Sequence, residues 1–187
     1  MNKINQAVIL CGGKGERLRP LTQSTPKPMI KIDNRPFLEF LIKKISSQGI
    51  NRFVILSGYL GDQIKDYFGS GADWGIDIQY SHGPTEWDTA KRLWESRNLL
   101  DKSFLFLYSD NYINLDLIKL ENHHYNSKKP LTLSLAKKEN GNIAIDKKSK
   151  VIKYDLNRDD LSLDLVEIGF MIANKSQIIG YYDNKNS

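Results

Sequence analysis

Short apolar runs alternate along the first half of the chain with stretches whose apolar residues recur at helical spacing. An unbroken apolar run is typical of a strand buried on both faces, whereas the spaced stretches are typical of helices that bury one face. These runs, with one alternating segment, predict strands at Ala7–Cys11, Phe53–Leu56, Ile76–Tyr80 and Phe104–Tyr108. The spaced stretches predict helices at Pro36–Gln48, Asp62–Phe68, Thr89–Leu100 and Leu115–Tyr125.

The second half of the chain is richer in short strands. They are predicted at Leu131–Ala136, Asn142–Asp146, Val151–Asp155 and Val166–Ile172. The regular alternation that precedes them favours an α/β fold, with a Rossmann-like mixed, mainly parallel central sheet flanked by helices and right-handed crossovers. No repeat, low-complexity tract or linker divides the 187 residues, so we expect a single domain over residues 1–187.

Two loops follow predicted strands at the edge of such a sheet where function is expected. Ligands of open parallel sheets bind beyond the carboxyl ends of the strands. Gly12–Arg19 follows the first strand, and Ser109–Asn111 follows the strand that ends at Tyr108.

The charge and the motifs of the chain indicate which kinds of partner those loops could bind. The net charge of +5 suits an anionic partner, which could be nucleic acid, a phosphorylated metabolite or a membrane surface. The chain lacks the aromatic and basic signature of an RNA-recognition module and any zinc-finger pattern, so we expect no nucleic acid. No apolar stretch approaches the ~18 residues of a membrane helix, so we expect no membrane partner.

Cys11 is the single cysteine, which excludes an intrachain disulfide and fits a reducing, cytoplasmic location. It ends an apolar run, so we expect a buried and inert thiol. One cysteine and three scattered histidines cannot form a zinc site.

The glycine-rich loop fits neither of two familiar nucleotide motifs. Gly13 and Gly15 begin G-x-G-x-x-G, but Leu18 stands where its third glycine belongs. A P-loop fails as well, because Gly13-Lys14 is followed by a glycine rather than by serine or threonine.

The physical character of the loop nevertheless suits phosphate. Glycines let the backbone approach a phosphate closely and point N–H groups at it. Arg17, Arg19 and Lys27 add cations that can reach phosphate oxygens. From these residues alone, a tight turn with solvated basic side chains stays open as the alternative.

The order of these residues is more specific than their chemistry. GGKGERLRPLT (Gly12–Thr22), followed by PKPM (Pro26–Met29), resembles the signature of the sugar-1-phosphate nucleotidylyltransferases. The segment Val54–Gly69 and the strand that leads to Asp110 are also similar to that family. The resemblance extends from Gln6 to Ile172, and it implies the nucleotide-diphospho-sugar transferase fold.

The resemblance implies an enzyme that joins a nucleoside triphosphate to a sugar 1-phosphate, releasing pyrophosphate. Its catalytic residues would be Arg17, which stabilises the departing pyrophosphate, and Lys27, which steadies the phosphates on both sides of the transfer. Asp110 would hold the Mg²⁺ cofactor, which bridges phosphate oxygens in this family.

Substrate-binding residues also follow from the resemblance. It assigns nucleotide binding to Leu10, Gly12, Gly13, Asp88 and Thr89. It assigns sugar binding to Gly141 and Glu167, for which a turn glycine and an exposed strand carboxylate are the alternatives.

Three departures from the family pattern affect these expectations. The family commonly has L-G-T-[AG]-G near the base, whereas this chain has WDTAK (Trp87–Lys91), which leaves base recognition open. Many members carry E-K-P after the strand that ends here at Tyr154, and this chain does not. Together with VEIGF at Val166–Phe170, this makes the chain more similar to the heptose- and mannose-1-phosphate guanylyltransferase branch. No W-x-D-[IV]-G motif supplies a second metal-binding aspartate. Three explanations stay open: a C-terminal portion is missing, Asp110 holds the ion with substrate alone, or the protein has lost catalysis.

Three functional hypotheses remain. The first is a Mg²⁺-dependent nucleotidylyltransferase of surface-polysaccharide biosynthesis that uses GTP with heptose or mannose 1-phosphate. The second is a catalytically impaired nucleotide-sugar binding or regulatory module, and the third is a cytidylyltransferase that acts on another phosphorylated acceptor. A homo-oligomer is left open, since members of the family often associate.

Overall fold

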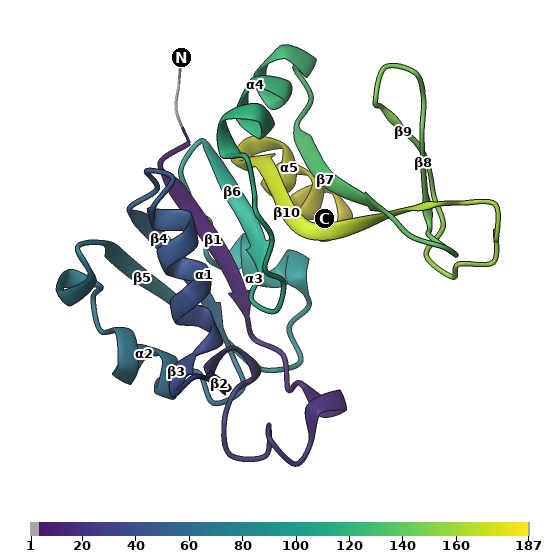
Figure 1. The fold of residues 1–187 in the computed structure, drawn as a ribbon. Coiled ribbons are helices and arrows are strands. Elements are labelled where there is room, and N and C mark those ends of the chain that lie inside the picture. Colours follow the sequence, from purple (N-terminus) through teal and green to yellow (C-terminus); the bar gives the residue numbers. More distant parts are fainter. Residues whose placement is uncertain (1–3, 187) are drawn as a thin grey trace. The chain divides into compact units, whose positions relative to one another are not determined.

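The computed structural model describes residues 4–186, and the chain divides into two compact units (Figure 1). The first unit comprises residues 4–132 and 171–186, and the second comprises residues 133–170. Whether the units act as the single domain expected from the sequence stays a prediction.

A parallel sheet forms the centre of the first unit. Its strands are β1 (Gln6–Cys11), β4 (Arg52–Ser57), β5 (Asp77–His82) and β6 (Ser103–Tyr108), in the order β5-β4-β1-β6. β10 (Leu165–Asn174), whose last four residues belong to this unit, follows β6 in the sheet order.

The register of the central strand aligns the ends of its neighbours. β1 pairs in parallel with β4 from Gln6↔Arg52 to Cys11↔Ser57, and with β6 up to Leu10↔Tyr108. The loops that follow these strands therefore leave the sheet at the same edge.

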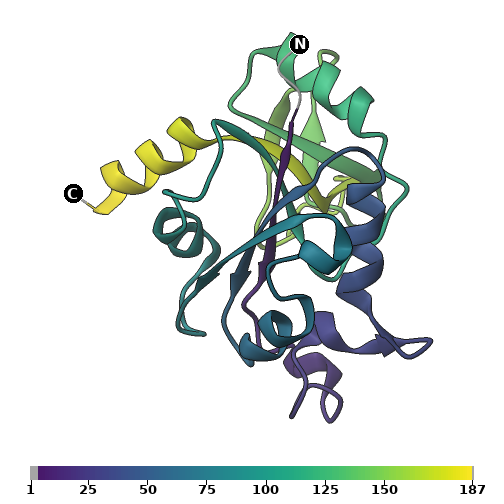
Figure 2. The same cartoon turned by 90° about the vertical axis from the view of Figure 1, so that its left-hand side faces the viewer.

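Helices cover both faces of this sheet. They are α1 (Phe37–Ser46), α2 (Asp62–Phe68), α3 (Thr89–Glu95), α4 (Leu117–Ser127) and α5 (Lys175–Asn186). Figure 2 shows α1 on one face, with α3 and α5 on the other. α1 turns Leu38, Leu41, Ile42 and Ile45 into the core, which explains the helical spacing of its apolar residues. No helix within residues 4–186 is long and apolar enough to cross a lipid bilayer.

The second unit is built from strands. β7 (Leu131–Lys137) enters it from the first unit, and β8 (Ile143–Ile145) and β9 (Val151–Tyr154) follow. β8 pairs antiparallel with β9 and, through Ile143↔Leu165, with β10, while β7 also pairs with β10.

The structure confirms the predicted mixed, mainly parallel sheet flanked by helices, and the strand-rich second half. The largest difference from the predicted helices is in α3, which ends at Glu95 rather than at Leu100. The hydroxyl of Ser96 donates to the carbonyl oxygen of Leu93 (3.0 Å), and the chain continues in turns.

Three described elements were not predicted. They are the strands β2 (Lys31–Ile32) and β3 (Arg35–Pro36), which form a hairpin, and the final helix α5. Three single-turn 3₁₀ helices also occur, at Glu16–Leu18, Lys27–Met29 and Ala72–Trp74.

The buried centre of the sheet provides a stability test. Phe104 on β6 is completely buried, so Phe104→Ala should lower the free energy of unfolding by about 3–5 kcal/mol, through lost burial and the cavity left behind. Urea denaturation measures this change. Ile118→Ala on α4, where the side chain is 70% exposed, should change it by less than about 0.5 kcal/mol. Equal unfolding midpoints for the two variants would contradict this packing.

Candidate active site

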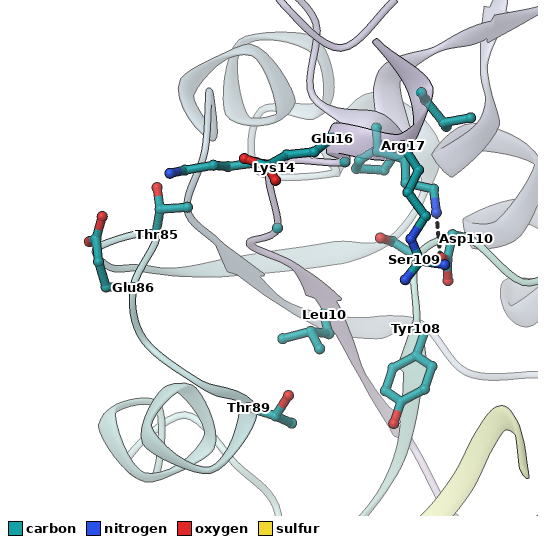
Figure 3. Close-up of a pocket in the computed structure, with 15 residues that line it drawn as sticks. Leu10, Lys14, Glu16, Arg17, Thr85, Glu86, Thr89, Tyr108, Ser109 and Asp110 are labelled. Carbon is teal, nitrogen blue, oxygen red and sulfur yellow. Dashed lines mark hydrogen bonds and ion pairs between the residues drawn. The ribbon is translucent and has the colours of Figure 1, made fainter. Parts of the chain in front are cut away.

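A cavity of about 930 Å³ opens at the carboxyl edge of the sheet in the first unit (Figure 3). Its walls come from the loop after β1, the segment between β5 and α3, and the end of β6. Figure 3 shows Lys14, Thr85 and Glu86 on one side and Arg17, Ser109 and Asp110 on the other, with Leu10 between them. The volume is that of a small-molecule site.

The loop after β1 is folded tightly around Gly15. This residue has a left-handed backbone (φ 63°), and its carbonyl oxygen accepts hydrogen bonds from the Leu18 N–H (2.9 Å) and the Thr22 hydroxyl (2.9 Å). A Cβ there would come within 3.1 Å of Lys27 and Thr22 side-chain atoms. The turn presents Lys14, Glu16 and Arg17 to the cavity.

Gly13 differs from the other glycines of this loop. A Cβ at Gly13 would meet no protein atom within 4 Å, and the residue is exposed and lines the cavity. Packing within the protein therefore does not require this glycine. An anion in the cavity that needs a bare backbone would explain it.

Lys27 and Asp110 form an ion pair in the wall of the cavity. The Lys27 Nζ lies 2.6 Å from the Asp110 Oδ2, and both side chains are partly exposed. Pro28 and Met29, buried in the 3₁₀ turn that Lys27 begins, anchor the lysine. Because water reaches the pair, it adds little to stability and can open for a charged ligand.

The cavity brings together six of the residues that the sequence assigned to the site. They are Leu10, Gly13, Arg17, Lys27, Thr89 and Asp110. The Arg17 side chain points toward the end of β6, where Ser109 and Asp110 lie (Figure 3).

Gly12 and Asp88 do not line this cavity. Gly12 is buried, and a Cβ on it would come within 2.3 Å of the Arg92 guanidinium carbon. Asp88 caps α3, because its Oδ1 accepts the backbone N–H of Lys91 (2.7 Å). Each therefore has a structural role in the first unit, and nucleotide binding through either stays a prediction.

The two expected sugar-binding residues belong to the second unit. Gly141 is buried, and a Cβ on it would come within 2.4 Å of the Leu165 carbonyl oxygen, so strand packing alone requires a glycine. Glu167 is half-buried and accepts the backbone N–H of Gly169. Burial raises the pKa of Glu167, although hydrogen bonds from Gly169 and Phe170 oppose that shift. Sugar binding by Gly141 and Glu167 stays a prediction.

The segment that departs from the family pattern is engaged in local packing. The Trp87 ring covers Gly83, where a Cβ would come within 2.2 Å of ring carbons. Lys91 pairs with Glu95 (2.5 Å) and lies 4.7 Å from the centre of the Trp94 ring. Thr85, Glu86 and Thr89 are the residues of this region that reach the cavity.

Sequence reasoning missed several residues that line the cavity. They include Lys14, Glu16, Thr85, Glu86 and Tyr108. Thr85 and Glu86 could have been found by applying the rule of the carboxyl edge to the strand that ends near Tyr80. Arg92, which lies behind the glycine loop, carried no comparable signal, because a charged residue in a short helix is usually solvated.

The carboxylate of Asp110 can contribute to a magnesium site but cannot form one alone. Within residues 4–186 no three His, Cys, Asp or Glu side chains cluster as a metal site. Mg²⁺ is commonly held by one or two carboxylates, with water and substrate phosphates completing its oxygen ligands. One accessible carboxylate at a strand end fits that mode.

The sequence pattern of the family described as Nucleotidyl transferase matches residues 6–154. The chain belongs to this family. The match spans the glycine loop, Lys27 and Asp110, and it confirms the resemblance and the enzyme class inferred from GGKGERLRPLT and PKPM.

Relatives named for activity on sugar 1-phosphates support this assignment. D-glycero-alpha-D-manno-heptose 1-phosphate guanylyltransferase from Aneurinibacillus thermoaerophilus is 32% identical over 175 residues, which are 91% of this chain and 75% of that protein. UTP–glucose-1-phosphate uridylyltransferase from Synechocystis sp. is 33% identical over 124 residues, which are 60% of this chain and 32% of that protein.

Solved structures confirm the fold. HddC from Yersinia pseudotuberculosis superimposes with a TM-score of 0.80 at 22% sequence identity, covering 95% of this chain and 80% of that one. At this identity the likeness establishes the nucleotide-diphospho-sugar transferase fold alone.

Cys11 gives a chemical test of the packing beneath the site. It is the single cysteine and is buried, as expected. Burial raises the pKa of its thiol to about 12. A hydrogen bond with Ser109 opposes this rise, and the negative charge of Asp110 adds to it. At pH 8 only about one thiol in 10⁴ would ionise, so a thiolate-specific disulfide reagent should not label the folded protein. In urea, where the pKa returns to ~8.5, one thiol per chain should react rapidly. Rapid labelling without denaturant would show that Cys11 is accessible.

Proposed function

We propose that this chain transfers a nucleotidyl group from a nucleoside triphosphate to a sugar 1-phosphate and releases pyrophosphate. The observation that carries the proposal is the cavity, which is lined by Gly13, Arg17, Lys27 and Asp110. The chain that forms this cavity belongs to the Nucleotidyl transferase family. The two substrates are the only partners that the proposal requires.

The proposed reaction is an in-line displacement at the α-phosphorus. An oxygen of the sugar phosphate forms the new P–O bond, and the bond to the β-phosphate breaks with its electron pair leaving on pyrophosphate. The protein contributes position and charge. Gly13 admits the triphosphate, Arg17 neutralises the departing pyrophosphate, and Lys27 contacts the phosphates on both sides of the transfer.

Asp110 would hold Mg²⁺ together with phosphate oxygens. The ion would supply positive charge that screens the triphosphate and orients it for attack. In the structure the carboxylate is paired with Lys27, so we propose that substrate binding separates the pair. Lys27 would then be free to contact phosphate, and Asp110 to bind the ion.

We propose GTP as the nucleotide and a heptose or mannose 1-phosphate as the acceptor. Three relatives named as heptose- or mannose-1-phosphate guanylyltransferases support this choice, two of them aligned over more than nine-tenths of this chain. Other relatives are named for cytidylyl or uridylyl transfer, which makes the nucleotide the first quantity to measure. The product would supply surface-polysaccharide synthesis from the cytoplasm.

Pyrophosphate release tests the proposal directly. The protein should be assayed with Mg²⁺ and each of ATP, CTP, GTP and UTP, against hexose 1-phosphates, heptose 1-phosphates and a non-sugar phosphate. Release with GTP and a heptose or mannose 1-phosphate is expected. Release with CTP and the non-sugar acceptor would favour the cytidylyltransferase, and tight nucleotide binding without release would favour the binding module.

Arg17 should affect the chemical step. Arg17→Ala should lower the single-turnover rate by on the order of 10² or more, because it removes a charge from the developing pyrophosphate. Rapid-quench measurement of nucleotide-sugar formation gives this rate. Arg19→Ala is the matched control, since Arg19 is a neighbouring exposed arginine that pairs with Glu16 (3.6 Å) and does not line the cavity. Equal rates for the two variants would contradict the role of Arg17.

Asp110 should set the dependence on magnesium. Asp110→Asn should raise the Mg²⁺ concentration for half-maximal rate and lower the saturating rate by on the order of 10². The measurement is a Mg²⁺ titration of pyrophosphate release, with Asp66→Asn on the exposed surface of α2 as control. An unchanged titration curve for Asp110→Asn would remove Asp110 from the metal site.

A further inference from the structure

A buried arginine joins the loops that form one side of the cavity. Arg92 on α3 is only 4% exposed. Its Nη1 donates to the Ser57 carbonyl oxygen (2.6 Å) and more weakly to that of Gly83 (3.5 Å), and its Nη2 donates to the Pro84 carbonyl oxygen (2.6 Å). Ser57 ends β4, and Gly83 and Pro84 follow β5, so one guanidinium links two strand ends.

The same guanidinium also packs against two backbone segments without side chains. A Cβ at Gly12 would lie 2.3 Å from its Cζ, and a Cβ at Gly58 would lie 2.7 Å from its Nη2. The Gly12 carbonyl oxygen in turn accepts the Tyr59 N–H (3.3 Å). Arg92 therefore lies between the loops that follow β1, β4 and β5.

Backbone carbonyls replace a carboxylate as the partners of this charge. Within residues 4–186 no carboxylate oxygen lies within 4 Å of the Arg92 nitrogens. Burial lowers the pKa of the guanidinium, the negative charge of Glu86 opposes that shift from beyond hydrogen-bonding distance, and arginine stays charged at neutral pH. Burying a charge is costly unless it is well hydrogen-bonded, and three fixed carbonyl oxygens supply those bonds.

Two of the three segments that Arg92 contacts are followed directly by residues that line the cavity. Gly12 precedes Gly13 and Lys14, and Pro84 precedes Thr85 and Glu86. Arg92 does not line the cavity itself. The contacts therefore fix two cavity walls from behind, and a small shift of either loop would change the space between them.

We propose that Arg92 is a positioning residue that sets the spacing between the glycine loop and the segment between β5 and α3, and thereby the affinity for the nucleoside triphosphate. The part that concerns affinity rests on the proposed function, in which the triphosphate lies between these walls. The part that concerns the loops stands on the contacts alone. Arg92 does not line the cavity, so it takes no direct part in the proposed chemical step.

The first measurement tests the loops without any substrate. Arg92→Lys keeps the charge but loses the planar fork that reaches two strand ends at once. The N–H groups of Tyr59, Gly83 and Trp87 bond to the carbonyl oxygens of Gly12, Ser57 and Pro84, which Arg92 contacts or packs against. Their hydrogen exchange should accelerate by about tenfold or more, while exchange in β1 stays unchanged.

Arg97→Lys is the matched control. Arg97 lies two residues beyond α3, donates to the Trp94 carbonyl oxygen (2.9 Å) and stacks on the Trp94 ring (3.7 Å), away from the cavity. It should leave exchange at Tyr59, Gly83 and Trp87 as in the original protein. Equal exchange at these amides in both variants would overturn the proposal.

The second measurement is kinetic. Arg92→Lys should raise KM for GTP by about tenfold, while kcat changes by less than about threefold and KM for the sugar phosphate stays constant. A merely structural role would lower the active fraction without changing KM. Gly12→Ala places a methyl group against the same guanidinium. Because the two changes act on one contact, Gly12→Ala should raise KM for GTP less in the Arg92→Lys variant than in the original protein.

The two measurements separate the two ideas. Altered exchange at the three amides with no pyrophosphate release from any substrate would uphold the positioning role and reject the proposed function. Pyrophosphate release by the original protein, with hydrogen exchange and KM for GTP unaltered in Arg92→Lys, would uphold the proposed function and reject the positioning role. If Arg92→Lys does not fold, Gly12→Ala alone carries the exchange test, since its methyl group must displace the same guanidinium.

Discussion

The parallel pairing of β1 with a strand on each side is the constraint on which the site depends. Because β1 is flanked in register by β4 and β6, the chain leaves all three strands at one edge. The glycine loop, the carbonyl of Ser57 and the carboxylate of Asp110 therefore lie at the same edge of the sheet, although they are separated by up to 98 residues of sequence. Completely buried side chains on these strands hold that register.

Neighbouring glycines of the loop after β1 serve different purposes. Gly12 faces the protein, where its missing side chain leaves room for Arg92, and Gly13 faces the cavity, where no protein atom competes for the space. Gly15 makes the left-handed turn that brings Arg17 to the wall. A single motif thus combines internal packing, ligand access and chain reversal, which accounts for its density of glycine.

Much of this arrangement could be predicted from sequence, because its signals are local. Three continuous apolar runs and one alternating segment identified the parallel strands, and the order of glycine, arginine and lysine identified the family. The end of α3 depends on a hydroxyl bond of Ser96 that periodicity does not reveal. The helix α5 lacks a clear apolar face, and the β2–β3 hairpin has only two residues per strand.

The position of Arg92 could not be predicted, because it depends on the order of strands in space. In the sequence it is one basic residue among many, whereas in the fold it lies where three loops meet. Asp88 was assigned from the family pattern, but its contact is the local cap of a helix. Family resemblance predicts where a site lies, and the contacts of each side chain show which of the assigned residues also have a structural role.

The central claim is that a nucleoside triphosphate binds at the carboxyl edge of the sheet. Titration of the ¹⁵N-labelled protein with Mg²⁺ and a non-hydrolysable GTP analogue, followed by NMR of backbone amides, tests this claim most directly. We expect shifts at Gly13, Arg17, Glu86 and Asp110, and none at Arg52, which begins β4 at the opposite edge. Shifts confined to the opposite edge, or no shifts with analogues of any of the four nucleotides, would contradict the account.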